Sequence, residues 1–396
     1  MKYAIVIPDG AADLPCEDLG GKTPLEAADT PNMDWIAAHG RCGLVRTVPK
    51  GLYAGSDVAI LSVLGYDPKH YYTGRAPLEA AAQDLKIGPD EWVFRCNFVT
   101  IVDGRMEDYS AGHISSKEAS ALIDELNRLL ADERVRFYPG VSYRHLMTFK
   151  GDCRHVLTTP PHDISGQAVA QHMPVGGGGD ALRVLIQRSG AILENQEINI
   201  VRRDLGENPA NSIWLWGQGR MPQLPSFIER FGIKGAAITA VDLVRGLAKL
   251  IGWECVSVPG ATGYLDTNYA GKGAAAAEAL NRLDIVCVHV EATDEAGHNA
   301  DAAGKAEALT KIDKHIVGPI LARLRDEGDQ WRILVMPDHP TPCSVRTHTA
   351  DPVPFAIAGA RVSSIKQSPF TEAAAAEGDL QVERGHELME YFLTVR

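Results

Sequence analysis

Short apolar runs alternate with helix-like segments in the first and last thirds of this sequence, and this alternation restricts the fold more than any other feature. Residues 3–7 (YAIVI) and 284–291 (DIVCVHVE) are typical of buried strands. Residues 241–252 and 272–283 carry apolar side chains at helical spacing. Strands that alternate with helices predict an α/β fold, with a mostly parallel sheet and helices on both of its faces.

The other elements predicted in these two parts of the chain follow from the same patterns. The remaining strands are expected at residues 43–48, 234–239, 254–259, 332–337 and 354–359. The remaining helices are expected at residues 23–40, 56–65 and 306–328. In the first of these helices, Pro31 lies near the start and Gly40 just past the end.

The middle of the chain has a different pattern, which predicts an inserted α+β domain at residues 86–219. Two hairpins are expected at residues 92–115, with a turn at Asp103-Gly104, and at residues 135–151. Helices are expected at residues 119–133 and 178–199. A chain of 396 residues is longer than one ordinary core requires. We therefore predict a discontinuous first domain, residues 1–85 and 220–396, that surrounds the insertion.

Composition excludes several classes of partner. The net charge of −12 argues against a nucleic-acid-binding surface, because phosphate backbones select basic surfaces. No uninterrupted apolar stretch approaches eighteen residues, which predicts no membrane span. The seven cysteines are scattered and contain no C-x-x-C, a pattern typical of reduced thiols in the cytoplasm rather than of a disulfide framework or a thiolate zinc site. The oligomeric state stays open.

Residues of metal-ligand type follow several of the predicted strands. Because the carboxyl ends of parallel strands lie at one edge of a sheet, these side chains are expected to converge there. The candidate ligands are Asp9, Asp294, His298, Asp338, His339 and His348. Six carboxylate and imidazole ligands are enough for two metal ions, and this mixture suits Zn²⁺ or Mn²⁺ better than Ca²⁺.

Ser56 is the candidate nucleophile. It follows Gly55 at the expected start of a helix, where backbone N–H groups and the helix dipole favour a bound phosphate. A metal ion beside its hydroxyl would stabilise the alkoxide and so replace a general base.

The motifs around these residues resemble those of cofactor-independent (2,3-bisphosphoglycerate-independent) phosphoglycerate mutases of the archaeal type, a branch of the alkaline phosphatase superfamily. The segments that carry the resemblance are VIPDGAAD, AGSDVAILSVLGYDP, ATDEAGH, MPDHPTP and RTHTADPVPFAI, with YYTGRAPLEA, MEDYSAGHI, PPHDISGQ and NPANSIWLWGQG between or beside them. They span essentially the whole chain and occur in the family's order.

This resemblance implies a metal-dependent isomerase of glycolysis and gluconeogenesis that interconverts 3-phosphoglycerate and 2-phosphoglycerate. One divalent ion would be bound by Asp294, His298 and His348, and the other by Asp9, Asp338, His339 and the Ser56 oxygen. Mn²⁺ is the expected ion, with Zn²⁺, Mg²⁺ or Co²⁺ as alternatives. Ser56 would carry the phosphoryl group as a phosphoserine.

The residues that hold the substrate are predicted mainly in the insertion, which we expect to close as a lid that excludes water. Asp163 and Lys234 are candidate catalytic residues beside Ser56. The candidate substrate-binding residues are His162, Arg144, Arg75, Arg202 and Arg203, because arginine can bind carboxylates and phosphates with two parallel hydrogen bonds.

Two other enzyme classes use the same metal ligands. One is a homoserine kinase-like phosphotransferase of threonine biosynthesis, whose substrate carries an ammonium group that needs an acidic partner. Asp163 is compatible with this class and with the mutase. The other is a metal-dependent phosphoester hydrolase, which admits water to the same serine; the large insertion argues against it.

Overall fold

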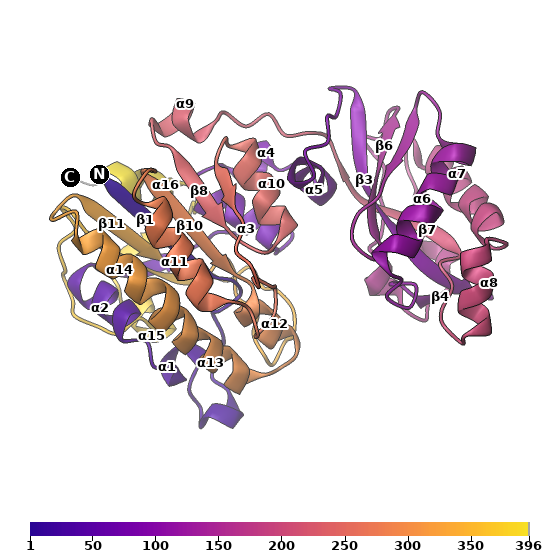
Figure 1. Ribbon diagram of the computed structural model, residues 1–396. Helices are drawn as coiled ribbons and strands as arrows, with labels where there is room; N and C mark the ends of the chain where they lie inside the picture. The colour runs from indigo at the N-terminus through magenta and orange to yellow at the C-terminus, as the bar shows by residue number, and fades with distance from the viewer. Residues whose placement is uncertain (395–396) are drawn as a thin grey trace. The chain divides into compact units, whose positions relative to one another are not determined.

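The computed structural model describes residues 1–394 and divides into two compact units (Figure 1). The first unit contains Met1–Tyr72 and the chain from Gln223 onward, and the second contains Thr73–Pro222. The second unit starts earlier than the predicted residue 86 because helix α5 (Arg75–Ala82) packs against two strands of that unit, β3 (Glu91–Val102) and β7 (Ser212–Gly219).

The first unit is built on one sheet, which within the described residues has the strand order β13-β2-β12-β11-β1-β10-β8-β9. Its strands are β1 (Lys2–Pro8), β2 (Arg41–Val45), β8 (Gly235–Ile238), β9 (Glu254–Val256), β10 (Ile285–Val290), β11 (Trp331–Val335), β12 (Val353–Gly359) and β13 (Leu380–Val382). The run from β11 through β9 is parallel, and only β12 is antiparallel to its neighbours. The predicted mostly parallel sheet is confirmed.

Both faces of the central strand β1 are buried. Ala4 and Val6 belong to the main core, which includes side chains from α2, α11, α13 and α14. Tyr3 points to the opposite face and packs edge-on against Phe392 of α16, with ring centroids 5.6 Å apart. Burial on both faces explains why residues 3–8 of this strand carry no charge and do not alternate between apolar and polar.

The helices of the first unit surround this sheet. Their bounds are α1 (Pro24–Ala27), α2 (Pro31–His39), α3 (Ser56–Val63), α4 (Pro68–Tyr71), α9 (Phe227–Phe231), α10 (Asp242–Leu250), α11 (Tyr269–Ala279), α12 (Ala292–His298), α13 (Ala302–Ile312), α14 (Gly318–Arg325), α15 (Glu372–Ala376) and α16 (Glu387–Thr394).

Two of the predicted helices are interrupted. The helix predicted at residues 23–40 is divided into α1 and α2 because Pro31 begins a new helix at its N1 position. The helix predicted at 306–328 contains a π-helical turn at Asp313–Val317, between α13 and α14. The Asp313 carboxylate accepts hydrogen bonds from the N–H groups of Asn32 and Met33, at 3.2 and 2.7 Å, and so caps the start of α2.

The second unit is an antiparallel sheet with helices packed on it. Its further strands are β4 (Arg105–Asp108), β5 (Val135–Tyr138) and β6 (Arg144–Lys150), in the order β4-β3-β6-β5, with β7 also paired to β3. Helices α6 (Ser116–Leu130) and α7 (Gly179–Leu193) contribute to its core, and α8 (Glu197–Asp204) follows α7. Asp103 and Gly104 both have positive φ, 48° and 71°, as the predicted hairpin turn requires.

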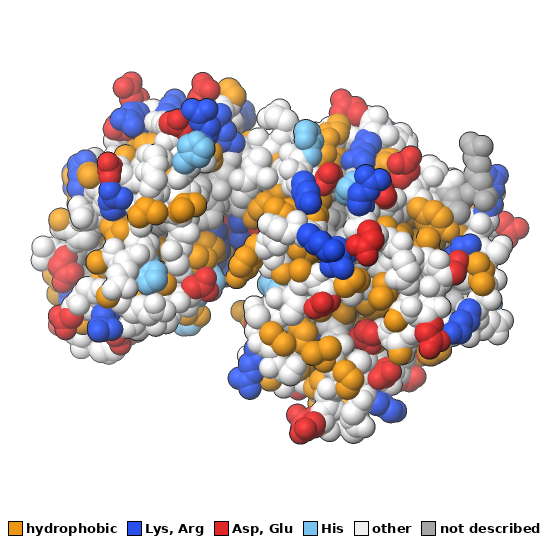
Figure 2. All heavy atoms as spheres, turned by 180° about the vertical axis from the view of Figure 1, so that it is seen from behind, with side chains coloured by type: hydrophobic (Ala, Val, Ile, Leu, Met, Phe, Trp, Pro, Cys, Tyr) orange, Lys and Arg blue, Asp and Glu red, His pale blue; other side chains and the backbone are white. Residues whose placement is uncertain are grey.

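Two surface properties bear on the predicted partners. Acidic and basic side chains are interspersed over the face of the protein that Figure 2 shows. Among the described residues, no helix has both the length and the apolar character needed to cross a membrane.

Candidate active site

The candidate site is at the carboxyl edge of the central parallel strands of the first unit. Asp9 directly follows β1, and Asp294 is on α12, which begins shortly after β10. Asp338 and His339 follow β11. Since β10 and β11 are both parallel neighbours of β1, their ends bring these side chains together. The sequence prediction rested on this convergence.

The first group of ligand-type side chains lies around Asp9 and Asp338. His339 Nε2 is 3.5 Å from Asp9 Oδ1 and 3.4 Å from Asp338 Oδ2. Ser56, the first residue of α3, places its Oγ 3.1 Å from the same nitrogen. The Asp9, Asp338 and His339 side chains are fully buried, while Ser56 is partly exposed. A substrate can therefore reach the serine, and the charged groups behind it are shielded from water.

The second group is formed by Asp294, His298 and His348. His298 Nε2 lies 3.2 Å from Asp294 Oδ2, and His348 Nε2 lies 3.4 Å from Asp294 Oδ1. The two imidazole nitrogens are 3.0 Å apart. His339 connects the two groups, because its ligand atom also lies within 4.8 Å of those of Asp294 and His348.

Two observations show that these residues fit bound cations. Within residues 1–394, Asp9 Oδ1 and Asp338 Oδ2 are buried oxygens that accept no hydrogen bond, a costly arrangement unless a cation occupies the space beside them. Burial, together with the carboxylates of Asp338 and Asp294, raises the pKa of Asp9 well above its usual range.

The histidine contacts are also those of metal ligands. His298 Nδ1 is 3.0 Å from the Arg346 carbonyl oxygen, and His339 Nδ1 is 3.3 Å from the Pro340 carbonyl oxygen. A carbonyl only accepts, so both rings carry the proton on Nδ1 and leave the Nε2 lone pair available to a metal ion.

Several residues that hold these side chains were not predicted. His289, inside strand β10, lies with Nε2 2.8 Å from Asp9 Oδ2 and Nδ1 3.2 Å from Thr239 Oγ1. Thr341 donates its hydroxyl to Asp294. Gly10 has a φ of +61°, and its N–H donates to Asp338 Oδ1 at 3.1 Å. A histidine within an otherwise apolar strand was the one available signal for His289.

A second cluster lies within the inserted unit. Arg75 and Arg95 both pair with Glu79, at 3.4 and 3.0 Å. The Arg95 guanidinium lies 4.3 Å from the centre of the Trp216 ring, which also packs edge-on against His162.

Titration properties extend this cluster. Burial lowers the pKa of Arg95 to about 10, with further lowering by Arg75 and Arg144. Burial also lowers the pKa of His162, while the adjacent Asp163 opposes that shift. Direct contacts thus join Arg75, His162 and Asp163 through Glu79, Trp216 and Arg95, a member that sequence reasoning missed. Arg144 is linked to this cluster through the effect of its charge on Arg95.

Three predicted residues lie elsewhere. Lys234 directly precedes β8, and the register pairs Gly235 with Ile285 at the start of β10. It is therefore at the amino edge of the sheet, opposite the site, and its side chain is exposed. Arg202 is buried and bonded to Glu118, Glu207 and three carbonyl oxygens. Arg203 pairs with Glu194 at 3.0 Å on the surface of α8. These three residues are not part of either cluster.

Comparison with known proteins decides the family. A protein from Methanothrix thermoacetophila named 2,3-bisphosphoglycerate-independent phosphoglycerate mutase is 51% identical to this chain over 389 residues, 98% of each chain. This chain belongs to that family. A relative from Geobacter sulfurreducens, named a probable 2,3-bisphosphoglycerate-independent phosphoglycerate mutase, is 48% identical and covers 99% of this chain and 100% of its own length. A family model with the same description matches residues 37–199.

Solved structures agree with this assignment. The PH0037 protein from Pyrococcus horikoshii is 31% identical, with a TM-score of 0.84 and coverage of 99% of this chain and 96% of its own. A cofactor-independent phosphoglycerate mutase from Thermoplasma acidophilum is 27% identical, with a TM-score of 0.68 and 99% coverage of both chains.

Membership of the phosphoglycerate mutase family has two consequences. It implies divalent metal ions and a small phosphorylated substrate, in agreement with the ligand-type groups at the carboxyl edge. The homoserine kinase and hydrolase alternatives receive no support from these relatives, which are named mutases.

Proposed function

We propose that this chain interconverts 3-phosphoglycerate and 2-phosphoglycerate through a phosphoserine at Ser56, without added 2,3-bisphosphoglycerate. The observation that carries the proposal is the partly exposed Ser56 hydroxyl, 3.1 Å from His339 Nε2 and in front of the buried Asp9 and Asp338 carboxylates. The names of relatives about half identical over nearly the whole chain support the substrate. A role in glycolysis and gluconeogenesis and the cytoplasmic location predicted from the cysteine pattern are parts of this proposal.

We propose two metal ions, each bound by one of the two groups. Asp294, His298 and His348 would bind one, and Asp9, Asp338 and His339, with the Ser56 oxygen, would bind the other. The mixture of carboxylates and imidazoles supports Mn²⁺ as the first choice, with Zn²⁺, Mg²⁺ and Co²⁺ as the alternatives. When bound, such ions stabilise the negative charge on the attacking oxygen, the leaving oxygen and the phosphoryl group.

The phosphoryl group moves in two displacements. Ser56 Oγ bonds to phosphorus as the bond to the substrate oxygen breaks, and the glycerate stays bound. The other glycerate hydroxyl then attacks the same phosphorus, and the Ser56 oxygen leaves. In each half the attacking hydroxyl loses one proton and the leaving oxygen gains one, so no nucleotide or net proton is consumed. The position of Ser56 at the start of α3 favours the negative phosphoryl group through the helix dipole.

Return of the phosphoryl group to the same glycerate requires that the intermediate stays bound and that water is excluded. We assign this role to the cluster of the inserted unit. Arg75, Arg95 and Arg144 are suited to bind carboxylate and phosphate. His162 and Asp163 are half-exposed neighbours, with His162 Nε2 3.7 Å from Asp163 Oδ1, and Asp163 would carry the hydroxyl proton.

The test is Ser56→Ala. We expect this variant to lose conversion of 3-phosphoglycerate, measured without bisphosphoglycerate, while its thermal unfolding stays close to that of the parent because the side chain is partly exposed. Incubation of the parent with substrate should add one phosphate to the peptide that contains Ser56. Ser364→Ala, at an exposed serine of the same unit, should keep both properties. A fully active Ser56→Ala enzyme would refute the mechanism.

A further inference from the structure

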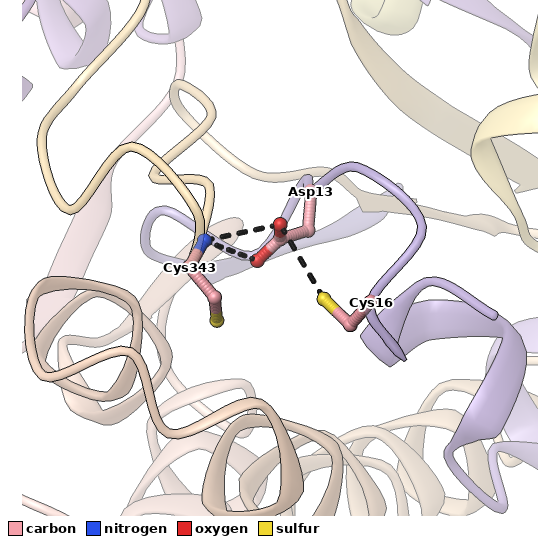
Figure 3. A group of neighbouring side chains, drawn as sticks. All are labelled: Asp13, Cys16 and Cys343. Atoms are coloured by element: carbon pink, nitrogen blue, oxygen red, sulfur yellow. Dashed lines mark hydrogen bonds between the residues drawn. The ribbon is translucent and has the colours of Figure 1, made fainter. Parts of the chain in front are cut away.

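A cluster of thiol and carboxylate side chains lies beside the catalytic groups but shares no residue with them. Asp13 and Cys16 are in the segment that follows β1, and Cys343 is in the segment that follows β11 (Figure 3). These are the same two segments that carry Asp9 and Asp338-His339 further upstream. One ligand atom from each of Asp13, Cys16 and Cys343 lies within 4.8 Å of the other two.

The geometry of this cluster fits a tetrahedral cation. Cys16 Sγ lies 3.9 Å from Asp13 Oδ1, and in Figure 3 it points toward that carboxylate. Zinc–sulfur and zinc–oxygen bonds of about 2.3 and 2.0 Å at a tetrahedral angle put sulfur and oxygen about 3.5 Å apart and two sulfurs about 3.8 Å apart. The three ligand atoms, which lie within 4.8 Å of one another, would approach these distances through side-chain rotation of Cys16 and Cys343.

The charges of the cluster also balance with a divalent cation. Lys305 Nζ, fully buried, is 2.7 Å from Asp13 Oδ2 and donates to the Thr341 carbonyl at 2.9 Å. The Cys343 N–H donates to both Asp13 oxygens, each at 3.1 Å. Without a bound cation, the Asp13–Lys305 ion pair and two protonated thiols have a net charge of zero. When a divalent cation is bound, its double positive charge and the Lys305 ammonium balance two thiolates and the Asp13 carboxylate. The buried site therefore need not carry net charge in either state.

A metal ion could reach the cluster from solvent through Cys16. Cys343 and Asp13 are buried, whereas Cys16 is partly exposed and offers an entry route for an ion. Asp13 already contacts the segment after β11 by accepting the Cys343 N–H, and Lys305 of α13 bridges Asp13 to the Thr341 carbonyl. These contacts do not require two cysteine side chains beside them.

We propose that Asp13, Cys16 and Cys343 form a second metal site, for a thiophilic divalent cation of the Zn²⁺ class, separate from the catalytic groups. A cation there joins the segment after β1 to the segment after β11, and so fixes the positions of Asp9, Asp338 and His339. Its role is structural, because its ligands form a group separate from those around Asp9 and Asp294.

The test uses Co²⁺, which gives thiolate-to-metal charge-transfer absorption only with sulfur ligands. The full-length enzyme is first saturated with Mn²⁺, which prefers oxygen and nitrogen ligands, and is then titrated with Co²⁺. We expect one equivalent of Co²⁺ to produce the charge-transfer band and one equivalent of Zn²⁺ to remove it. Cys16→Ser and Cys343→Ser should each lose the band, and Cys42→Ser, a buried cysteine on β2 outside the cluster, should keep it.

A second readout does not depend on cobalt. Zn²⁺ should raise the thermal unfolding midpoint of the Mn²⁺-saturated parent by several degrees, and this shift should disappear in Cys16→Ser. We expect this variant to fold, because the side chain of residue 16 is partly exposed. Absence of the band, or its survival in both cluster variants, overturns the proposal. So does a disulfide between Cys16 and Cys343, found by peptide mapping of metal-free protein that was isolated without reductant and has only five titratable thiols.

Discussion

Gly10→Ala tests whether the segment after β1 packs so tightly against Asp294 and Thr341 that it has no room for a Cβ at residue 10. A Cβ at this position would lie 2.5 Å from both Asp294 Oδ1 and Thr341 Oγ1, and 2.9 Å from the Asp294 Cα. Because a backbone atom is among these contacts, rotation of side chains alone cannot relieve the overlap. The φ of +61° adds a conformational cost of about 1–2 kcal/mol for alanine, and overpacking adds about 1–3 kcal/mol. We expect the free energy of unfolding to fall by about 2–5 kcal/mol.

Gly20→Ala is the matched control for this prediction. Its φ of +66° is nearly the same, but nothing lies within 4 Å of the added Cβ. The free energy of unfolding of Gly20→Ala should fall only by the backbone contribution, about 1–2 kcal/mol. Urea unfolding of both variants separates the backbone cost from the steric cost. The metal affinity of each variant is measured as well. Equal stabilities of the two variants would refute the steric argument. Unchanged metal affinity in Gly10→Ala would show that the added Cβ does not displace the Asp294 carboxylate.

Three further predictions concern metal, charge and pH. Chelation should abolish mutase activity and added Mn²⁺ should restore it; full activity in excess chelator would exclude a metal mechanism. In metal-free protein, Lys305→Met should lower the free energy of unfolding by about 3–5 kcal/mol, because it leaves the Asp13 carboxylate buried and uncompensated. The control Lys311→Met removes an exposed pair with Glu307 and should change the free energy of unfolding by less than about 0.5 kcal/mol. Similar losses in the two variants would contradict the argument from burial. Burial lowers the pKa of His145 to about 3, so on acidification the unfolded chain takes up this proton before the folded protein does. The stability that neutral His145 contributes is intact above about pH 6.5 and is lost as the pH falls toward 3. At pH 4 the free energy of unfolding should be lower by about 3 kcal/mol. His145→Asn, which keeps an acceptor for the Gly140 N–H, should flatten this acid dependence, and an unchanged pH profile would exclude His145 as its cause.

The residues at strand ends could be predicted because their position follows from sheet geometry alone. Asp9, Asp294 and Asp338 each come after an apolar run, and parallel strands bring such ends to one edge. The same rule excludes Lys234, which comes before its strand, and applying it to the start of residues 234–239 would have removed that prediction.

Arginine roles could not be predicted, because they depend on partners far away in the sequence. Arg202 is bound by Glu118 and by carbonyl oxygens of residues 111 and 112, whereas Arg95 joins Arg75 through Glu79. Strand periodicity shows that Arg95 is inside a strand but not which side chains face it. The proximity of Cys16 to Cys343 likewise arises only when β1 and β11 pair.

The position of β1 at the centre of its sheet has a consequence for biosynthesis. This strand precedes its two partners, β10 and β11, by more than half of the described residues, so it is translated long before them. The inserted unit, residues 73–222, is continuous in sequence and can complete its own sheet while the rest is still being made. The nascent chain therefore carries a largely apolar strand without its partners until β10 is made, and this segment is open to aggregation during that time.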